Sequence, residues 1–345
     1  MYSMSNSLPS CNGDPAGRDN VLRSFLGNAS AKQSLIALTN DGRLCHALLL
    51  TGEPGCGKRT FARIAAAAMV CESADKPCGV CVHCRKALGG IHPDVITLDC
   101  ADTANDGHRL ETLHARVLDT IAVAPNEAAR KVYVIANLES ISFGSSNALL
   151  KTLEEPPAHA MFLLLAERAE AFLPTILSRV VTMKIRPLSE ETVAEYLMQN
   201  GLSEEESHIL AAYAQGRIGQ ALELKEDEAF REMRQDILGR LEALPDMNEG
   251  EAYWMAKELE VYKNDLRFLD IMELWYRDLL TAKSLREERY LIQKDTKDAI
   301  FRGAKEPAEV LAKKAAAVRT ARVRLSQNAN FRLTLEVMLM DLKEN

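Results

Sequence analysis

A glycine-rich segment with one lysine is the first feature of the sequence that could do chemistry. It reads GEPGCGKRT, from Gly52 to Thr60, and nearly matches the pattern G-x-x-x-x-G-K-[ST] of a phosphate-binding loop. In such a loop, backbone N–H groups and the start of a helix face the phosphates, and the lysine reaches the terminal ones. The candidate phosphate-binding residues are Gly52, Gly55, Gly57, Lys58, Arg59 and Thr60.

The residue after the lysine departs from this pattern. Arg59 stands where a small hydroxyl normally holds Mg²⁺, and Thr60 comes one position late. One residue along a helix is a rotation of about 100°, so Thr60 does not simply replace it. The sequence therefore predicts no Mg²⁺ in this loop and leaves open whether the loop binds ATP or ADP.

A nucleotide hydrolase also needs a pair of acidic residues at the end of a neighbouring buried strand. The strand is present as VYVI, but Ala136 and Asn137 follow it, and neither can act as a general base. Glu139 lies two residues further on. Loss of the catalytic carboxylate alone usually costs several kcal/mol of barrier. An active ATPase would need Thr60 and Glu139 in displaced roles.

Four clustered cysteines form a second candidate site. Cys71, Cys78, Cys81 and Cys84 follow the spacing C-x6-C-x2-C-x2-C. Four thiolates complete a tetrahedral zinc shell with no open position, which is typical of a structural site. His83 lies inside the cluster and could replace one thiolate, and the same spacing also suits ordinary buried cysteines or a redox pair. We predict structural Zn²⁺ held by the four cysteines.

The composition is that of an ordinary globular chain. The 345 residues are 47% hydrophobic and 26% charged, with a formal net charge of −7. This acidity argues against a protein that coats nucleic acid or a membrane by bulk charge. No apolar run reaches the length of a membrane span, and the N-terminus lacks a signal-peptide core. We expect a cytoplasmic protein with reduced thiols and no membrane contact.

Strands alternate with helices in the first half of the chain. Apolar β-prone runs predict strands over residues 46–51, 93–99, 131–137, 161–166 and 180–185, and helical spacing is found over 21–40, 109–120 and 145–153. This alternation predicts an α/β fold with a parallel sheet covered by helices. Beyond Pro187 the strand signals stop and amphipathic helices follow.

Several of these stretches together resemble one family. They are LCHALLLTGEPGCGK, the cysteine cluster, GGIHPDVITLD, KVYVIANLES and above all NALLKTLEEPP, residues 147–157. They are similar to the AAA+ clamp-loader subunits of bacterial DNA polymerase III, from about residue 24 to the end. Residues 1–20 are polar and rich in turn-forming residues, and we expect them to be disordered. The resemblance implies an AAA+ domain over 21–187 with the zinc module at 71–84, a helical lid over 188–243 and a helical collar, the oligomerisation domain, over 244–345.

The resemblance also implies partners. Subunits of this family work in a hetero-oligomer with gamma or tau and delta subunits, and the assembly places a sliding clamp on primed DNA. The family contains hydrolysing motors, gamma or tau, and a largely inactive branch, delta prime. The acidic pair of the motors falls on Ala136 and Asn137, their sensor-one hydroxyl near Glu167 and their sensor-two arginine on Gly219. These departures are similar to the delta-prime branch.

Arg179 is the functional residue that the resemblance preserves. Ser178 and Arg179 match a Ser-Arg-Cys motif of the family, with Val180 in place of the cysteine. The match implies an arginine finger that reaches the ATP of a neighbouring subunit, a role that suits a planar, always charged guanidinium. The residue could also be a surface arginine paired with a carboxylate. For the whole chain, an active gamma- or tau-type motor and a zinc-dependent nucleic-acid-binding module stay open, although the acidic composition argues against the second.

Overall fold

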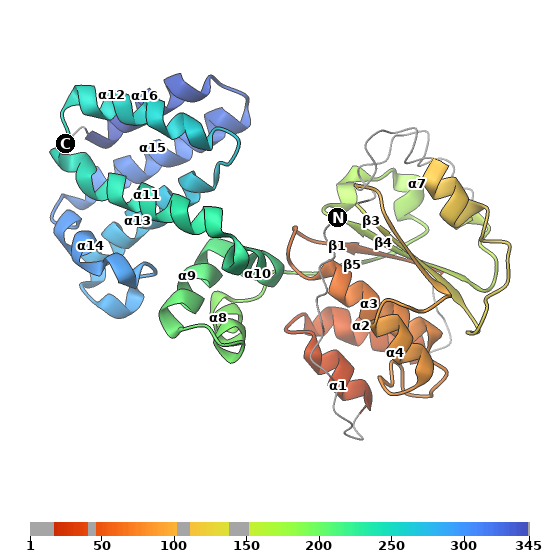
Figure 1. The fold of residues 1–345 in the computed structure, drawn as a ribbon. Coiled ribbons are helices and arrows are strands. Elements are labelled where there is room, and N and C mark those ends of the chain that lie inside the picture. Colours follow the sequence, from red (N-terminus) through yellow and green to blue (C-terminus); the bar gives the residue numbers. More distant parts are fainter. Residues whose placement is uncertain (1–16, 41–45, 102–110, 138–151, 344–345) are drawn as a thin grey trace. The chain divides into compact units, whose positions relative to one another are not determined.

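The chain forms two compact units. The computed structural model describes residues 17–40, 46–101, 111–137 and 152–343. The first unit comprises residues up to Leu188 together with Arg217–Gly219, and the second comprises Ser189–Gly216 and the chain from Gln220 onwards (Figure 1). In these described ranges, no helix combines the length and the apolar character that a membrane span requires.

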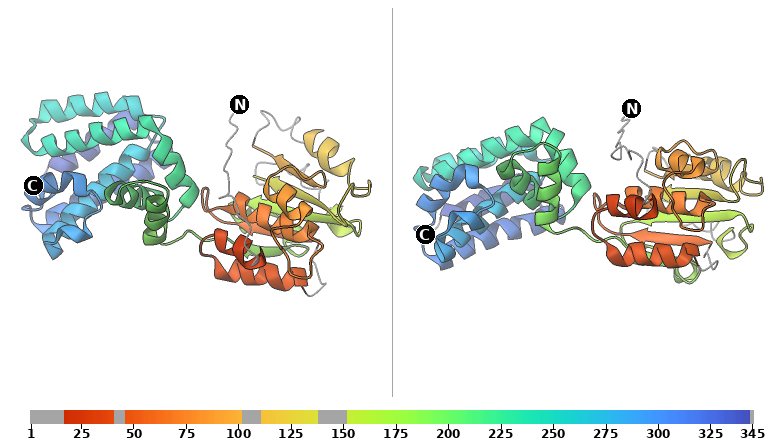
Figure 2. Two further views of the ribbon diagram at one scale, coloured as in Figure 1. Left: turned by 60° about the horizontal axis from the view of Figure 1, so that its bottom comes forward. Right: turned by 90° about the horizontal axis from the view of Figure 1, so that it is seen from below.

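A five-stranded parallel sheet forms the centre of the first unit. Its strands lie side by side in the order β2-β3-β4-β1-β5 (Figures 1 and 2). The predicted strands are confirmed, and their bounds are β1 Ala47–Thr51, β2 Val95–Asp99, β3 Lys131–Ala136, β4 Ala160–Ala166 and β5 Val181–Lys184. The three inner strands are buried along their whole length, which explains why they read as continuous apolar runs.

Each face of the sheet has its own hydrophobic core. Alternate residues of β1 point to opposite faces, so Leu48 and Leu50 pack with helix α3 (Lys58–Val70), whereas Leu49 packs on the other face. The same face as α3 carries α4 (Val82–Leu88). The opposite core includes residues from the helical segment 111–118, which has π-helical pitch over His114–Leu118, and from α7 (Pro174–Leu177). The predicted α/β architecture is therefore correct.

The start of the first unit corrects one prediction. Residues 17–20, predicted to be disordered, belong to helix α1 (Gly17–Ser24). The helix is held because its Val21 and Leu22 are buried in the core on the α3 face. The rest of the predicted disordered segment, residues 1–16, lies outside the described residues.

The single helix expected over 21–40 is in fact two helices. Gly27 and Asn28 take positive φ angles of 59° and 48°, and α2 (Ala29–Asn40) begins directly afterwards. The Asn28 side chain explains this break, because its amide donates to the carbonyl of Arg186 at 3.0 Å and its oxygen accepts the Arg186 N–H at 2.8 Å. The helix predicted over 145–153 and Glu139 lie largely or wholly outside the described residues, which resume at Thr152.

The second unit is helical throughout its described residues (Figures 1 and 2). Its α-helices are α8 Glu190–Gln199, α9 Glu204–Ala214, α10 Ile218–Glu226, α11 Glu228–Ala243, α12 Glu249–Glu258, α13 Arg267–Leu285, α14 Lys297–Gly303, α15 Ala308–Ser326 and α16 Phe331–Lys343, of which α10 begins in the first unit. Helix α13 is central and packs against α11, α14 and α15. Arg322 of α15 fastens this packing through ion pairs with Asp270 and Glu273 of α13, both at 2.7 Å.

Of the predicted domain boundaries, the one between the lid and the collar near residue 243 stays a prediction. The boundary predicted near residue 187 lies close to the division after Leu188. The helices assigned to a lid over 188–243 and to a collar over 244–345 lie in one compact unit, because α11 packs directly against α13.

Candidate functional site

The phosphate loop connects β1 to α3, as its sequence pattern requires. Gly52, Gly55 and Gly57 have φ angles of 153°, 79° and 95°, a region that favours glycine. Gly52 is also required by space, since a Cβ there would lie 2.2 Å from the carbonyl oxygen of Ile185. The loop is thus wedged against the residue that follows β5.

Lys58 and Thr60 lie in the first turn of α3, beside the loop. Gly57 precedes the helix without a side-chain cap, so the first N–H groups of α3 have no capping oxygen. The Lys58 ammonium donates to the carbonyls of Gly52 at 2.5 Å and Glu53 at 3.0 Å. The uncapped N-terminus of α3 and the Lys58 ammonium together create a positive electrostatic potential at the loop, which favours binding of a phosphate group.

The Arg59 side chain reaches the carboxyl end of strand β2. Its guanidinium forms an ion pair with Asp99, the last residue of β2. Asp99 also accepts the side-chain N–H of Asn137 at 2.6 Å and the backbone N–H of Ala101 at 3.0 Å. Arg59, Asp99 and Asn137 therefore form one hydrogen-bonded group at the carboxyl ends of β2 and β3.

The segment Arg217–Gly219, which belongs to the first unit, lies against the loop. The N–H of Gly219 donates to the carbonyl of Gly55 at 2.8 Å, and a Cβ at Gly219 would lie 2.9 Å from that same oxygen. Arg217 approaches Glu53 at 3.9 Å. Gly219, which stands where the resemblance places a sensor arginine, packs its backbone directly against the backbone of Gly55. A residue with a side chain would not fit there without a shift of the backbone.

Arg179 lies just after α7, far along the chain from the loop. One of its terminal nitrogens donates to the carbonyl of Thr175 at 2.9 Å and to the hydroxyl of Ser178 at 3.1 Å. The other forms an ion pair with Glu154 at 3.0 Å. Its side chain is 36% exposed, so the arginine is oriented by three partners and still reaches solvent.

The four cysteines converge, as predicted. Cys71 follows the last residue of α3, and Cys81 caps the N-terminus of α4. All four sulfur atoms lie within 4.8 Å of one another, and Cys78 Sγ lies 3.9 Å from Cys84 Sγ. Four ligands in a tetrahedron with Zn–S of about 2.3 Å would place the sulfurs about 3.8 Å apart. The cluster is compatible with structural zinc and would tie the end of α3 to α4.

Backbone N–H groups tune the ionisation of the thiols. Burial opposes ionisation of Cys78, but hydrogen bonds from the N–H groups of Cys81 and Val80 and from the thiols of Cys81 and Cys71 together outweigh it and lower the pKa of Cys78 to about 7. Burial raises the pKa of Cys84, which is fully enclosed. Without a metal, ionisation is therefore easy at one thiol and costly at another, and a bound cation would remove this conflict by stabilising all the thiolates.

His83 belongs to a separate group of residues. Its Nδ1 lies 3.0 Å from Nε2 of His92, and Glu127 completes a second set of potential ligands. Burial lowers the pKa of His92, and its Nδ1 accepts the N–H of Asp94 at 3.0 Å. The neutral ring therefore carries its proton on Nε2, which donates to His83 and has no lone pair for a metal. His83 is occupied by His92 and is not needed as a zinc ligand.

Comparison with known proteins shows what the chain is similar to. Residues 27–189 match the family described as DNA polymerase III, delta subunit. The delta' subunit of Bacillus subtilis is 28% identical over 311 residues, covering 88% of this chain and 92% of that protein. The gamma subunit of Buchnera aphidicola subsp. Schizaphis graminum is 37% identical over 215 residues, covering 59% of this chain and 58% of that subunit. The chain belongs to the clamp-loader subunit family of bacterial DNA polymerase III.

The chain spans nearly the whole Bacillus relative but little more than half of the Buchnera one. Among solved structures, a gamma-subunit-related protein of Thermotoga maritima is 18% identical, with coverage of 90% of this chain and 98% of that one and a TM-score of 0.41. The parallel sheet, the loop between β1 and α3 and the helical region that follows give this family member an AAA+ fold.

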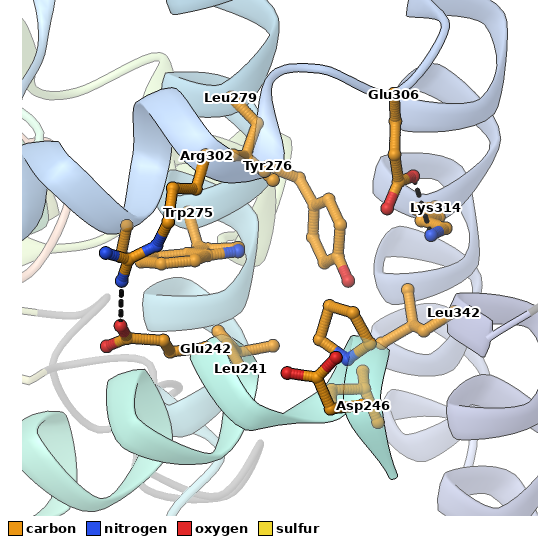
Figure 3. A pocket seen from close by; sticks show the side chains of 14 residues that line it. Leu241, Glu242, Asp246, Trp275, Tyr276, Leu279, Arg302, Glu306, Lys314 and Leu342 are labelled. Atoms are coloured by element: carbon orange, nitrogen blue, oxygen red, sulfur yellow. Dashed lines mark hydrogen bonds and ion pairs between the residues drawn. The ribbon is translucent and has the colours of Figure 1, made fainter. Parts of the chain in front are cut away.

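The second unit of this clamp-loader subunit holds a cavity of about 260 Å³ between α11, α13, α14, α15 and α16. Four of the charged residues that line it form two ion pairs, Arg302 with Glu242 and Lys314 with Glu306 (Figure 3). Trp275 and Tyr276 line it, and burial raises the pKa of Tyr276.

Sequence reasoning missed several polar residues of the first unit. In the sequence, Asp99 stands only at the end of a strand and Glu154 only near a helix end before Pro-Pro, yet they hold Arg59 and Arg179. One signal for Asp99 was available, because polar residues at the carboxyl ends of neighbouring parallel strands meet at one edge of the sheet. No local signal pairs Glu154 with Arg179.

Proposed function

We propose that this chain is a non-hydrolysing, delta-prime-like subunit of the clamp loader. The observation that carries the proposal is the group formed by Arg59, Asp99 and Asn137 at the place where a hydrolase has its metal ligand and its base. A guanidinium and an amide take no proton from water, and Ala136 has no functional group. The chemistry of the assembly then belongs to a neighbouring gamma- or tau-type subunit.

Arg179 is the residue through which the chain contributes to that chemistry. In this proposal it stabilises the charge that develops on the phosphates of the neighbour's ATP. Its geometry supports the role, because Thr175 and Ser178 orient the guanidinium while Glu154, itself 47% exposed, is a partner that can be exchanged for phosphate. Exposed ion pairs of this kind are worth no more than about 1 kcal/mol, so the exchange is easy.

The remaining partners follow from the same proposal. The chain assembles with gamma or tau and delta subunits in the cytoplasm, its helical second unit joins the collar of the complex, and it meets the sliding clamp and primed DNA through the assembly. Zn²⁺ held by the four cysteines has a structural role, since four sulfur ligands leave no position open for substrate. The zinc module stiffens α3 from its C-terminal end.

The test is ATP hydrolysis by a reconstituted loader that carries Arg179→Ala in this subunit alone. We expect the isolated subunit to be silent and hydrolysis at the dependent interface to fall on the order of 10³-fold, the usual worth of an arginine finger. Arg168→Ala is the matched control, because it removes an exposed arginine of the same unit. Hydrolysis by the isolated subunit would identify an active motor instead, and an unchanged rate with Arg179→Ala would exclude the finger.

A further inference from the structure

The residues at the magnesium position of the loop do not fit magnesium. Mg²⁺ takes oxygen ligands in an octahedron, and in phosphate loops these include a hydroxyl after the lysine and an acidic residue at a strand end. Here the first position is Arg59 and the second is Ala136, followed by Asn137. A guanidinium and a methyl group offer no oxygen. The family's usual metal ion therefore has no ligand at either place.

Asp99 is a carboxylate at this edge of the sheet, and it is already engaged. Its side chain is only 12% exposed, and one oxygen pairs with the Arg59 guanidinium. The other oxygen accepts N–H groups from Asn137 at 2.6 Å and Ala101 at 3.0 Å. A divalent cation bound to Asp99 would stand beside the positive charge of Arg59, which like-charge repulsion disfavours.

The Arg59 guanidinium has donors left over. Its side chain is 66% exposed, and it contacts Asp99 through Nη2. A guanidinium carries five N–H donors in a planar fork that matches phosphate oxygens. Lys58 and the uncapped N-terminus of α3 lie next to it. Two side-chain cations and a helix terminus together provide the positive field that phosphates normally receive from lysine and metal.

We propose that Arg59 is the resident cation of this loop and that the loop binds nucleoside di- and triphosphates without a metal ion. The inference rests on the proposed function, since a cation that is covalently part of the chain and paired with Asp99 binds phosphate but holds no water for attack. It also explains why Asn137 is tolerated at the position of the base, because its amide donates to Asp99 and fixes the carboxylate that anchors Arg59.

The contacts of Gly219 give the proposal a second consequence. Where a sensor arginine would reach the last phosphate, the chain has a glycine held to the loop by its backbone. Neither a metal ion nor the residue at position 219 then makes a contact with the γ-phosphate that would distinguish ATP from ADP. The loop binds ADP and ATP with similar dissociation constants.

The test is calorimetric titration of the full-length chain with ADP, first in EDTA and then in excess MgCl₂. We expect the two dissociation constants to agree within about threefold, less than 1 kcal/mol. Arg59→Thr, which restores the usual hydroxyl, should weaken binding in EDTA by about tenfold or more, the worth of a charge-assisted hydrogen bond, and should make binding depend on Mg²⁺. Arg85→Gln, at an exposed position of α4, is the control and should bind as the wild type does.

Three results would overturn the proposal: no ADP binding in either buffer, binding that needs Mg²⁺ in the wild type, or Arg59→Thr that binds in EDTA like the wild type. Circular dichroism checks the fold of each variant. If Arg59→Thr does not fold, Arg59→Lys tests the same point, because it keeps a charge beside Asp99 but loses the fork, and its affinity in EDTA should fall. No partner subunit takes part, so this experiment can fail while the Arg179 test succeeds, and the reverse.

Discussion

Asp94 is a buried carboxylate immediately before β2, and it organises the loop that precedes β3. It has no exposed surface. Its two oxygens accept the N–H groups of Asn126 at 2.6 Å, Glu127 at 2.8 Å and Ala128 at 2.9 Å, together with the Asn126 side chain at 3.1 Å. Burial alone would raise the pKa of Asp94, but these hydrogen bonds outweigh it and lower the pKa below its ordinary value of 3.8.

Replacing Asp94 tests this role. We expect Asp94→Asn to lower the free energy of unfolding by about 2 kcal/mol at neutral pH, because N–H donors lose a charged acceptor. A lowered folded-state pKa means that the carboxylate stabilises the fold above pH 3.8 and loses this effect as the pH falls further. The difference between wild type and variant, measured by urea denaturation, should therefore persist down to about pH 4 and shrink below it. Asp119→Asn, at an exposed position, is the control. A difference that grows in acid would contradict the assignment.

At the scale of residues, the sequence predicts those sites whose residues lie close together in the chain. The loop glycines, Lys58 and the four cysteines were found because each group lies within one short segment. The contact of Arg59 with Asp99 spans 40 residues, and that of Asn137 with Asp99 spans 38. Such pairs depend on which strands become neighbours, which a single sequence does not state. The cysteine cluster was therefore predictable, whereas the group formed by Arg59, Asp99 and Asn137 was not.

At the scale of elements, the start of α10 is fixed by its approach to the phosphate loop. Gly219 has an ordinary helical position, yet a Cβ there would come within 2.9 Å of the Gly55 oxygen and 3.1 Å of its Cα. Gly239 in α11 is the matched case, with nothing within 4 Å of the same added atom. Gly219 lies in the first turn of α10 and Gly239 in the interior of α11, and only Gly219 has backbone atoms close to the position of an added Cβ.

Alanine substitutions at these two glycines should change stability in opposite directions. Gly239→Ala should raise the free energy of unfolding by about 0.5–1 kcal/mol, because alanine loses less conformational freedom in a helix. Gly219→Ala should lower it by about 1–3 kcal/mol, because the added methyl group would clash with the backbone of Gly55. Both are measured by chemical denaturation. Equal gains from the two substitutions would show that the contact between Gly219 and Gly55 does not restrict the helix.

Secondary-structure elements were predicted correctly where the apolar runs are long, and incorrectly where a turn interrupts a helix. Strands β1, β3 and β4 were recognisable because both their faces are buried. The break between α1 and α2 was missed, because Asn28 takes a left-handed conformation only through its two hydrogen bonds to Arg186. The break depends on contacts with Arg186, which is 158 positions away in the sequence, and the spacing of apolar residues does not indicate such a contact.

At the scale of the whole molecule, each unit has its own core and its own buried polar anchor. In the first unit the anchor is Asp94, and the four cysteines lie at the end of α3 and the start of α4. In the second it is Asp278 of α13, which is fully buried, pairs with Arg277 at 2.7 Å and accepts the N–H of Gln293 at 2.8 Å. Units with separate cores are expected to unfold as separate cooperative units.

Scanning calorimetry of the full-length chain should therefore show two thermal transitions. A zinc chelator should lower only one midpoint, the one that Asp94→Asn also lowers, because the four cysteines and Asp94 belong to the same unit. Asp278→Asn should lower the other midpoint by about 5 °C, the shift expected for a loss of about 2 kcal/mol in a unit of this size. The chelator should leave that second midpoint unchanged. A single transition that responds to all three perturbations would mean that the two units unfold together, and a chelator without effect on either midpoint would mean that zinc does not stabilise the fold.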